Sequence, residues 1–133
     1  MTDAQNSTSN STATYAPQRD RIFADLSKLV SFNSPHSTPA LKDEHEAACA
    51  WTVEALKDLG FKVTRYPTVD DADTIVATKP AKNGMPTVLL YSHYDVVPAN
   101  DPEAWTNNPF ELTERDGRWY GRGAADCKGN LAM

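Results

Sequence analysis

The feature that most constrains the fold is a run of apolar residues that ends abruptly in polar ones. Residues 87–91 read TVLLY, and His93 and Asp95 follow almost directly. A continuous apolar run of this length is typical of a strand covered on both faces, as in the helix-covered sheets of α/β proteins. The run therefore predicts a central strand, an α/β fold class, and polar residues at the carboxyl end of that strand, where such sheets bind ligands.

The residues before this run predict two helices and two short strands. Apolar residues recur at helical spacing from Arg19, and Thr38 followed by a proline predicts the start of a second helix that ends at Gly60. The period then changes to two, which predicts strands at 61–66 and 73–80 with an acidic turn between them. The chain thus mixes helices and strands, as an α/β domain does.

The two ends of the chain define the expected domain organisation. Residues 1–17 are rich in Ser, Thr and Asn and poor in apolar side chains, so we expect a disordered polar tail there and one domain at 18–133. Asp116 and Gly117 predict a hairpin turn late in this domain. Residues 128–133 predict the first turn of a helix with no stop signal after it, so we expect the domain to be truncated at its end.

Charge, hydropathy and cysteine content argue against several classes of protein. The net charge of -5, without a basic patch, argues against a nucleic-acid partner. The first residues lack the regions of a secretory signal, and no stretch is apolar enough to span a bilayer, so we expect a cytoplasmic protein with no membrane partner. Cys49 and Cys127 are too few for a disulfide scaffold and are predicted to be reduced thiols.

Three residues are candidates for a metal site: His93, Asp95 and Asp126. Residues two apart in an extended chain point to the same side, so His93 and Asp95 can share one site. Asp126 follows Gly121 and Gly123, which allow a tight turn, and its two oxygens can bridge two cations about 3.5 to 4 Å apart. His nitrogen and carboxylate oxygen are ligands of catalytic zinc. Of His93 and Asp95, one can bind the metal while the other supports it, and Asp95 can be the acceptor that orients a ligating imidazole.

Each of these residues also has a simpler interpretation. His93 alone is equally well explained as a hydrogen-bonded histidine at a strand end, and Asp126 as a carboxylate favoured by a helix N-terminus. Their joint motif context favours the metal site. His36 and His45 are isolated, are expected to be solvated, and are assigned to no site. Trp105 is expected to pack its loop onto the sheet rather than to line a substrate cleft.

The segment from Leu89 to Gly129 resembles the metal-binding segment of the zinc exopeptidase family that includes aminoacylases, glutamate carboxypeptidases, desuccinylases and dipeptidases. The matching positions are His-x-Asp-x-x-Pro at 93–98, the stretch 105–110, the Asp-Gly of the hairpin, and Gly-Arg-Gly-Ala-x-Asp-x-Lys-Gly at 121–129. Together they cover about a third of the chain. The strings YSHYDVVP and ERDGRWYGRGAADCKG are most similar to the dipeptidase branch.

The resemblance implies a three-layer α/β catalytic domain with a mixed sheet, of which residues 18–133 would be the N-terminal part. It implies that His93 ligates one zinc ion, that Asp126 bridges two, and that Asp95 is a catalytic acid behind the imidazole. Cobalt and manganese accept similar ligands. The general-base glutamate and the remaining ligands of the family would lie after Met133, so the isolated chain is expected to be inactive.

The activity implied by the resemblance is metal-dependent hydrolysis of peptide or amide bonds, as a dinuclear zinc dipeptidase acting on a small peptide. An N-acyl amino acid deacylase or desuccinylase shares the same ligands, and nothing in the sequence separates the two. A catalytically inactive fragment or an interaction module is the alternative from another class. Substrate preference, metal identity and oligomeric state, with a homodimer as one option for the full-length protein, stay open.

Overall fold

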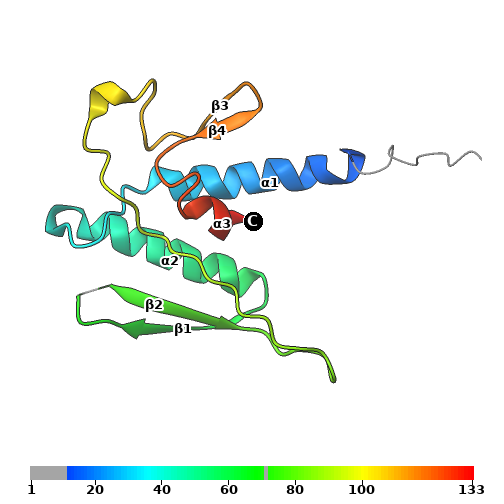
Figure 1. The fold of residues 1–133 in the computed structure, drawn as a ribbon. Coiled ribbons are helices and arrows are strands. Elements are labelled where there is room, and N and C mark those ends of the chain that lie inside the picture. Colours follow the sequence, from blue (N-terminus) through cyan, green and yellow to red (C-terminus); the bar gives the residue numbers. More distant parts are fainter. Residues whose placement is uncertain (1–11, 71) are drawn as a thin grey trace, which may run out of the picture.

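A computed structural model describes residues 12–70 and 72–133, with side chains from residue 18 (Figure 1). The elements are α1 (Thr12–Ser31), η1 (Pro39–Leu41), α2 (Lys42–Asp58), β1 (Lys62–Pro67), β2 (Asp73–Thr78), η2 (Pro102–Ala104), β3 (Thr113–Arg115), β4 (Arg118–Tyr120) and α3 (Lys128–Ala132). The hairpin β1–β2 lies against α2, while α3 packs on α1. No described helix is long and apolar enough to cross a bilayer.

Helix α1 carries the main apolar core. The predicted apolar stripe is confirmed, because Leu26, Leu29 and Val30 are buried. Leu26 and Val30 form a cluster with Leu112, against which the ring of Trp119 also packs. This cluster holds the segment around β3 and β4 against α1.

The start of α1 corrects one expectation from the sequence. The polar tail predicted at residues 1–17 is wrong for residues 12–17, which belong to α1. The physical reason is cooperativity: once a helix is nucleated, each added residue forms a hydrogen bond, so a stable helix extends into flanking residues of moderate propensity. Residues 1–11 lie outside the described residues, and the expectation of a tail there stays a prediction.

The predicted second helix is confirmed, with a different N-terminus. Thr38 and Pro39 begin the short η1 turn that leads into α2, but the Thr38 hydroxyl caps no backbone N–H of this turn. At the other end α2 finishes at Asp58, just before the predicted Gly60, which has a φ of 81°. The N–H of Gly60 donates to Lys57 O and that of Phe61 to Leu56 O, the paired bonds of a Schellman motif.

Both predicted hairpins are present, as separate two-stranded antiparallel sheets. Strands β1 and β2 pair from Lys62 with Thr78 to Pro67 with Asp73. Strands β3 and β4 are joined at Asp116 and Gly117, whose φ angles of 52° and 72° are those of the tight turn that the Asp-Gly pair predicts.

The central strand predicted at residues 87–95 is wrong for the structure described here. Residues 87–95 carry no strand pairing, and the nearest pairing is a single bridge between Pro35 and Val96. Val88, Leu89, Leu90 and Tyr91 are between 74% and 91% exposed. A strand requires a neighbour to accept and donate its ladder hydrogen bonds, and no described strand pairs with this segment.

An ion-pair network joins the β1–β2 hairpin to α2. The Arg65 guanidinium donates two hydrogen bonds to the Glu46 carboxylate, at 2.7 and 2.6 Å, and a third to Asp73 at 2.5 Å. The bond to Arg65 lowers the pKa of Glu46. Because the Glu46 side chain is 56% exposed, solvent screens part of this interaction.

We expect Glu46→Gln to lower the free energy of unfolding by about 0.5 to 1 kcal/mol at neutral pH, since it replaces a charge-assisted pair by a neutral bond. A carboxyl with a lowered pKa stabilises the fold above its unfolded value of 4.5 and loses that effect as pH falls through the folded pKa. The difference between variant and wild type in urea denaturation at neutral pH should therefore shrink at an acidic pH below 4.5. Glu54→Gln, which removes only the exposed pair with Lys57 on one helix, is the control. An equal loss at both pH values would contradict the ion-pair explanation.

Candidate metal centre

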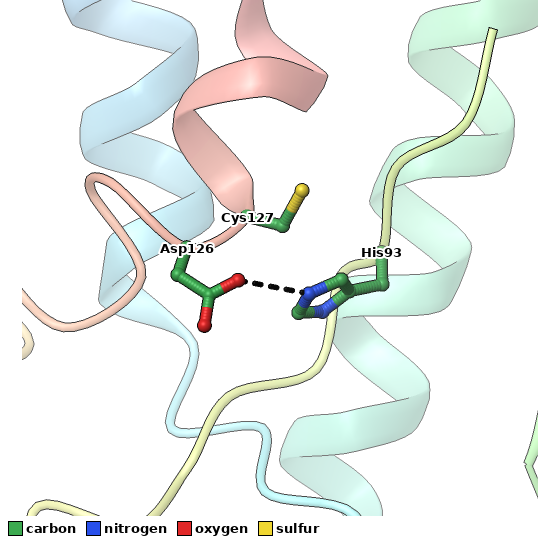
Figure 2. A group of neighbouring side chains, drawn as sticks. All are labelled: His93, Asp126 and Cys127. Atoms are coloured by element: carbon green, nitrogen blue, oxygen red, sulfur yellow. Dashed lines mark hydrogen bonds and ion pairs between the residues drawn. The ribbon is translucent and has the colours of Figure 1, made fainter.

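The structure brings together His93 and Asp126, which the sequence predicts as ligands. The Nε2 atom of His93 lies 3.2 Å from Oδ1 of Asp126, although the two residues come from segments far apart in the chain (Figure 2). Two ligands bound at about 2.0 to 2.2 Å to one tetrahedral ion lie roughly 3.3 to 3.5 Å apart, close to this separation. The nitrogen and oxygen donors therefore fit a shared zinc ion in both type and spacing.

Asp95 lies on the other side of the His93 ring, as predicted. Its Oδ1 is 2.9 Å from Nδ1 of His93, and its backbone oxygen is 3.2 Å from the same nitrogen. When Nδ1–H donates to Asp95, the lone pair of Nε2 faces Asp126. That tautomer is the one a metal requires, and a carboxylate behind the imidazole is the usual device that selects it.

Two carboxylates control the charge of His93. Partial burial of the ring disfavours the imidazolium, but the Asp95 charge and the bond to Asp126 outweigh burial and raise the pKa of His93. The side chain of Asp126 is 85% exposed, against 33% for His93, so the site is open to solvent on the Asp126 side. An ion can enter from that side.

The segment after α1 holds the His93 side of the site. The buried hydroxyl of Ser34 donates to Tyr94 O at 2.9 Å, and the N–H of Val96 donates to Ser34 O at 3.1 Å. Together with the bridge between Pro35 and Val96, these bonds fix the backbone on both sides of Asp95. The position of His93 therefore depends on a turn some sixty residues earlier in the chain.

The loop before α3 holds the Asp126 side. Gly123 has a φ of 84°, and a Cβ there would lie 2.9 Å from Val96 Cγ1 and 3.0 Å from Lys128 Cδ, so only glycine fits. The loop is closed by a bond from the N–H of Gly129 to Gly123 O, and the peptide bond that follows Asp126 is cis. The tight turn that the glycines predict is confirmed for Gly123.

Cys127 is a residue of the site to which the sequence assigned no role. One donor atom from each of His93, Asp126 and Cys127 lies within 4.8 Å of the others, the one such group of three among the described residues. The Ser92 hydroxyl, 3.2 Å from the sulfur, is the main reason that the pKa of Cys127 is lowered. Figure 2 shows the sulfur directed away from the contact between His93 and Asp126. The sequence signal that could have identified Cys127 as a residue of the site is its position next to Asp126 in the motif.

The other histidines take no part in this group. His36 pairs with Asp70 at 3.0 Å, but His45 is not solvated as expected: both of its ring nitrogens are buried, without a hydrogen-bond partner among the described residues, and the ring lies 5.1 Å from that of Tyr94. Trp105 has the Arg122 guanidinium over its ring at 4.9 Å, which supports a packing role.

The part of the chain that carries this site matches a known protein family. Residues 89–133 match the family described as Peptidase family M20/M25/M40. A cysteinylglycine-S-conjugate dipeptidase from Corynebacterium striatum is 62% identical over 117 residues, which are 88% of this chain and 26% of that protein. Human carnosine dipeptidase 1 superposes with a TM-score of 0.80 at 29% identity, over 90% of this chain and 28% of that one. The dipeptidase Dug1p from Saccharomyces cerevisiae does so with a TM-score of 0.73 at 25% identity, over 90% and 27%.

These relatives confirm the family resemblance seen in the sequence. They also confirm the α/β fold class, because the structural neighbours are dipeptidases and superpose on nine tenths of this chain. The chain spans about a quarter of the length of the relatives that it matches. The relatives bear on family and fold, while the roles of His93, Asp95 and Asp126 in metal binding stay predictions.

We expect Asp95→Asn to lower the pKa of His93, because the variant removes the largest of the interactions that favour the imidazolium. An NMR titration of the imidazole C–H protons, with His93 assigned by comparison with His93→Gln, measures this pKa directly. The titration of His36, which pairs with Asp70 instead, is the internal control. An unchanged His93 midpoint would show that Asp95 does not govern the charge of the ring.

Proposed function

We propose that this chain supplies part of the active site of a metal-dependent dipeptidase, in which His93 and Asp126 bind the metal and Asp95 orients the imidazole. The proposal is carried by one observation: Nε2 of His93 faces Asp126 at 3.2 Å, while Nδ1 is held by Asp95 at 2.9 Å. A histidine with only a structural role would not need a second carboxylate, here the solvent-exposed Asp126, beside its ring.

We propose a second metal ion in the complete enzyme, to which this chain would contribute the other oxygen of Asp126. The chemistry that a bound divalent metal supplies is polarisation of the scissile carbonyl and activation of water. Asp126 contributes two oxygens, and Figure 2 shows the second one directed away from His93, where it is available to a second cation. Asp95 keeps Nδ1 protonated and balances positive charge on the ring. We propose zinc, because nitrogen and carboxylate donors suit it, with cobalt and manganese as ions of similar preference.

The substrate that we propose is a dipeptide. The relatives named above are dipeptidases, and this favours a dipeptidase over an N-acyl amino acid deacylase with the same ligands. We also propose a cytoplasmic location, which is supported by two buried cysteines that are both free thiols.

We further propose that residues 1–133 alone bind metal without hydrolysing peptides. The group formed by His93, Asp126 and Cys127 contains no glutamate, and it is the one potential metal cluster that the described part of the chain offers. A hydrolytic site also needs a general base within hydrogen-bond reach of the attacking water. In the proposed enzyme, that base and the further ligands lie in another part of the protein. This part corresponds to the greater part of the relatives' length, which this chain does not span.

Cobalt(II) titration followed by visible absorption tests the metal site in the 133-residue chain. We expect His93→Ala to weaken binding by at least roughly 10-fold, and Asp95→Asn by about 10- to 100-fold, as for other groups that hold a ligating imidazole. His36→Ala should bind cobalt like the wild type. The same preparations should not hydrolyse cysteinylglycine. Cobalt binding indifferent to His93 would contradict the site, and turnover that His93→Ala abolishes would contradict the proposed inactivity of the chain.

A chimera tests the activity itself. This chain, exchanged for the matching quarter of the Corynebacterium striatum dipeptidase, should preserve dipeptide hydrolysis, because 62% of the aligned residues are identical. His93→Ala in the chimera should lower kcat/KM by roughly 10³-fold, the effect of losing several kcal/mol of metal-based stabilisation. His36→Ala should leave kcat/KM unchanged. A folded chimera without activity, or one unaffected by His93→Ala, would overturn the proposal.

A further inference from the structure

Lys128 is a fully buried lysine whose ammonium is bound to a helix end. It is 0% exposed, and its Nζ donates to Leu29 O and Phe32 O, each at 2.8 Å. An unpaired buried charge would be very unfavourable. The last carbonyls of a helix have no partners within the helix and carry partial negative charge, so the end of α1 compensates the ammonium.

The backbone links Lys128 closely to Asp126. Only Cys127 separates them, and the Lys128 side chain also packs on Gly123 at the start of the same loop. The Ser92 hydroxyl donates to Cys127 O at 3.1 Å, which joins the loop to the residue before His93. Loosening Lys128 would therefore release the part of the loop that carries the Asp126 carboxylate.

The end of α1 also anchors the opposite side of the site. The carbonyls that bind Lys128 belong to residues 29 and 32, and Ser34, which binds Tyr94 and Val96, follows two residues later. Both ligand-bearing segments are thus hydrogen-bonded to one short stretch of chain, and this stretch determines how far apart they lie.

We propose that Lys128 is a positioning residue: by binding the carbonyl end of α1 it holds Asp126 at the separation from His93 that a shared metal ion requires. Lys128 contacts neither the substrate nor the metal in this role. The inference rests on the metal site proposed above and assigns a new function to a side chain outside it.

Electrostatics and positioning predict opposite effects of removing this ammonium. A cation near a dication weakens metal binding by repulsion, so a purely electrostatic Lys128 would make Lys128→Met bind metal more tightly. A positioning Lys128 makes the same variant bind more weakly, since Asp126 is no longer held in place. Lys128→Gln, which lacks the charge but keeps N–H donors for the carbonyls, should then be intermediate.

The experiment is cobalt(II) titration of the 133-residue chain at neutral pH. We expect Lys128→Met to weaken binding by about 10- to 100-fold, as is typical for groups that orient ligands, and Lys128→Gln to recover part of the loss. The visible bands of the Met variant should also become weaker as water replaces a displaced carboxylate. Val53→Ala, which removes buried methyl groups from α2 far from both motifs in sequence, controls for a general loss of stability and should keep the wild-type affinity and spectrum.

Circular dichroism confirms that each variant is folded before titration, and Lys128→Gln decides the question if the Met variant does not fold. Unchanged or tighter cobalt binding by folded Lys128→Met or Lys128→Gln would overturn the inference. That result would leave the metal site intact, provided that His93→Ala still weakens cobalt binding in the wild-type background. Loss of the His93 dependence itself would instead remove the proposed function.

Discussion

The arrangement of this chain depends on the carbonyl end of α1. Every helix leaves its last carbonyls without partners inside the helix, and a fold must satisfy those that it buries. Here the carbonyl oxygens of Leu29 and Phe32 accept hydrogen bonds from the Lys128 ammonium. Ser34, two residues later, is hydrogen-bonded to Tyr94 and Val96. A requirement of backbone chemistry thus brings two distant segments to one place, and His93 and Asp126 meet there.

Much of the local structure could be predicted from the sequence because its causes are local. The stripe that contains Leu26 and Val30 gives α1, the glycine at position 60 ends α2 by adopting a positive φ, and Asp116 with Gly117 turns the second hairpin. The membership of His93, Asp95 and Asp126 in one site could also be predicted, since the motif fixes their types and spacing. What the motif left out was Cys127, whose sulfur lies beside the two predicted ligands.

The failures concern features that depend on partners elsewhere in space. The apolar residues 88–91 favour a buried strand, but a strand exists only where another backbone pairs with it, and no described strand pairs with them. His45 looked like a surface histidine, yet the ring of Tyr94 covers it, and no pattern near His45 contains that information. The burial of Lys128 is of the same kind, because its acceptors lie almost a hundred residues earlier in the chain.

The charges around the site explain why a buried lysine is tolerated so close to the proposed metal centre. Burial lowers the pKa of Lys128 to about 8, an effect that the Asp95 and Glu44 carboxylates partly oppose, so at neutral pH most of the ammonium stays charged. Asp95 and Asp126 bring two negative charges, and one lysine leaves the group net negative toward a divalent ion. Repulsion from Lys128 therefore weakens the attraction between the site and a divalent ion only modestly. The position in which Lys128 holds Asp126 matters more, because it decides whether Nε2 of His93 and Oδ1 of Asp126 can reach the same ion. A neutral side chain without N–H donors would remove the repulsion, but Leu29 O and Phe32 O would lose their bonds to residue 128 and the Asp126 loop would lose its anchor.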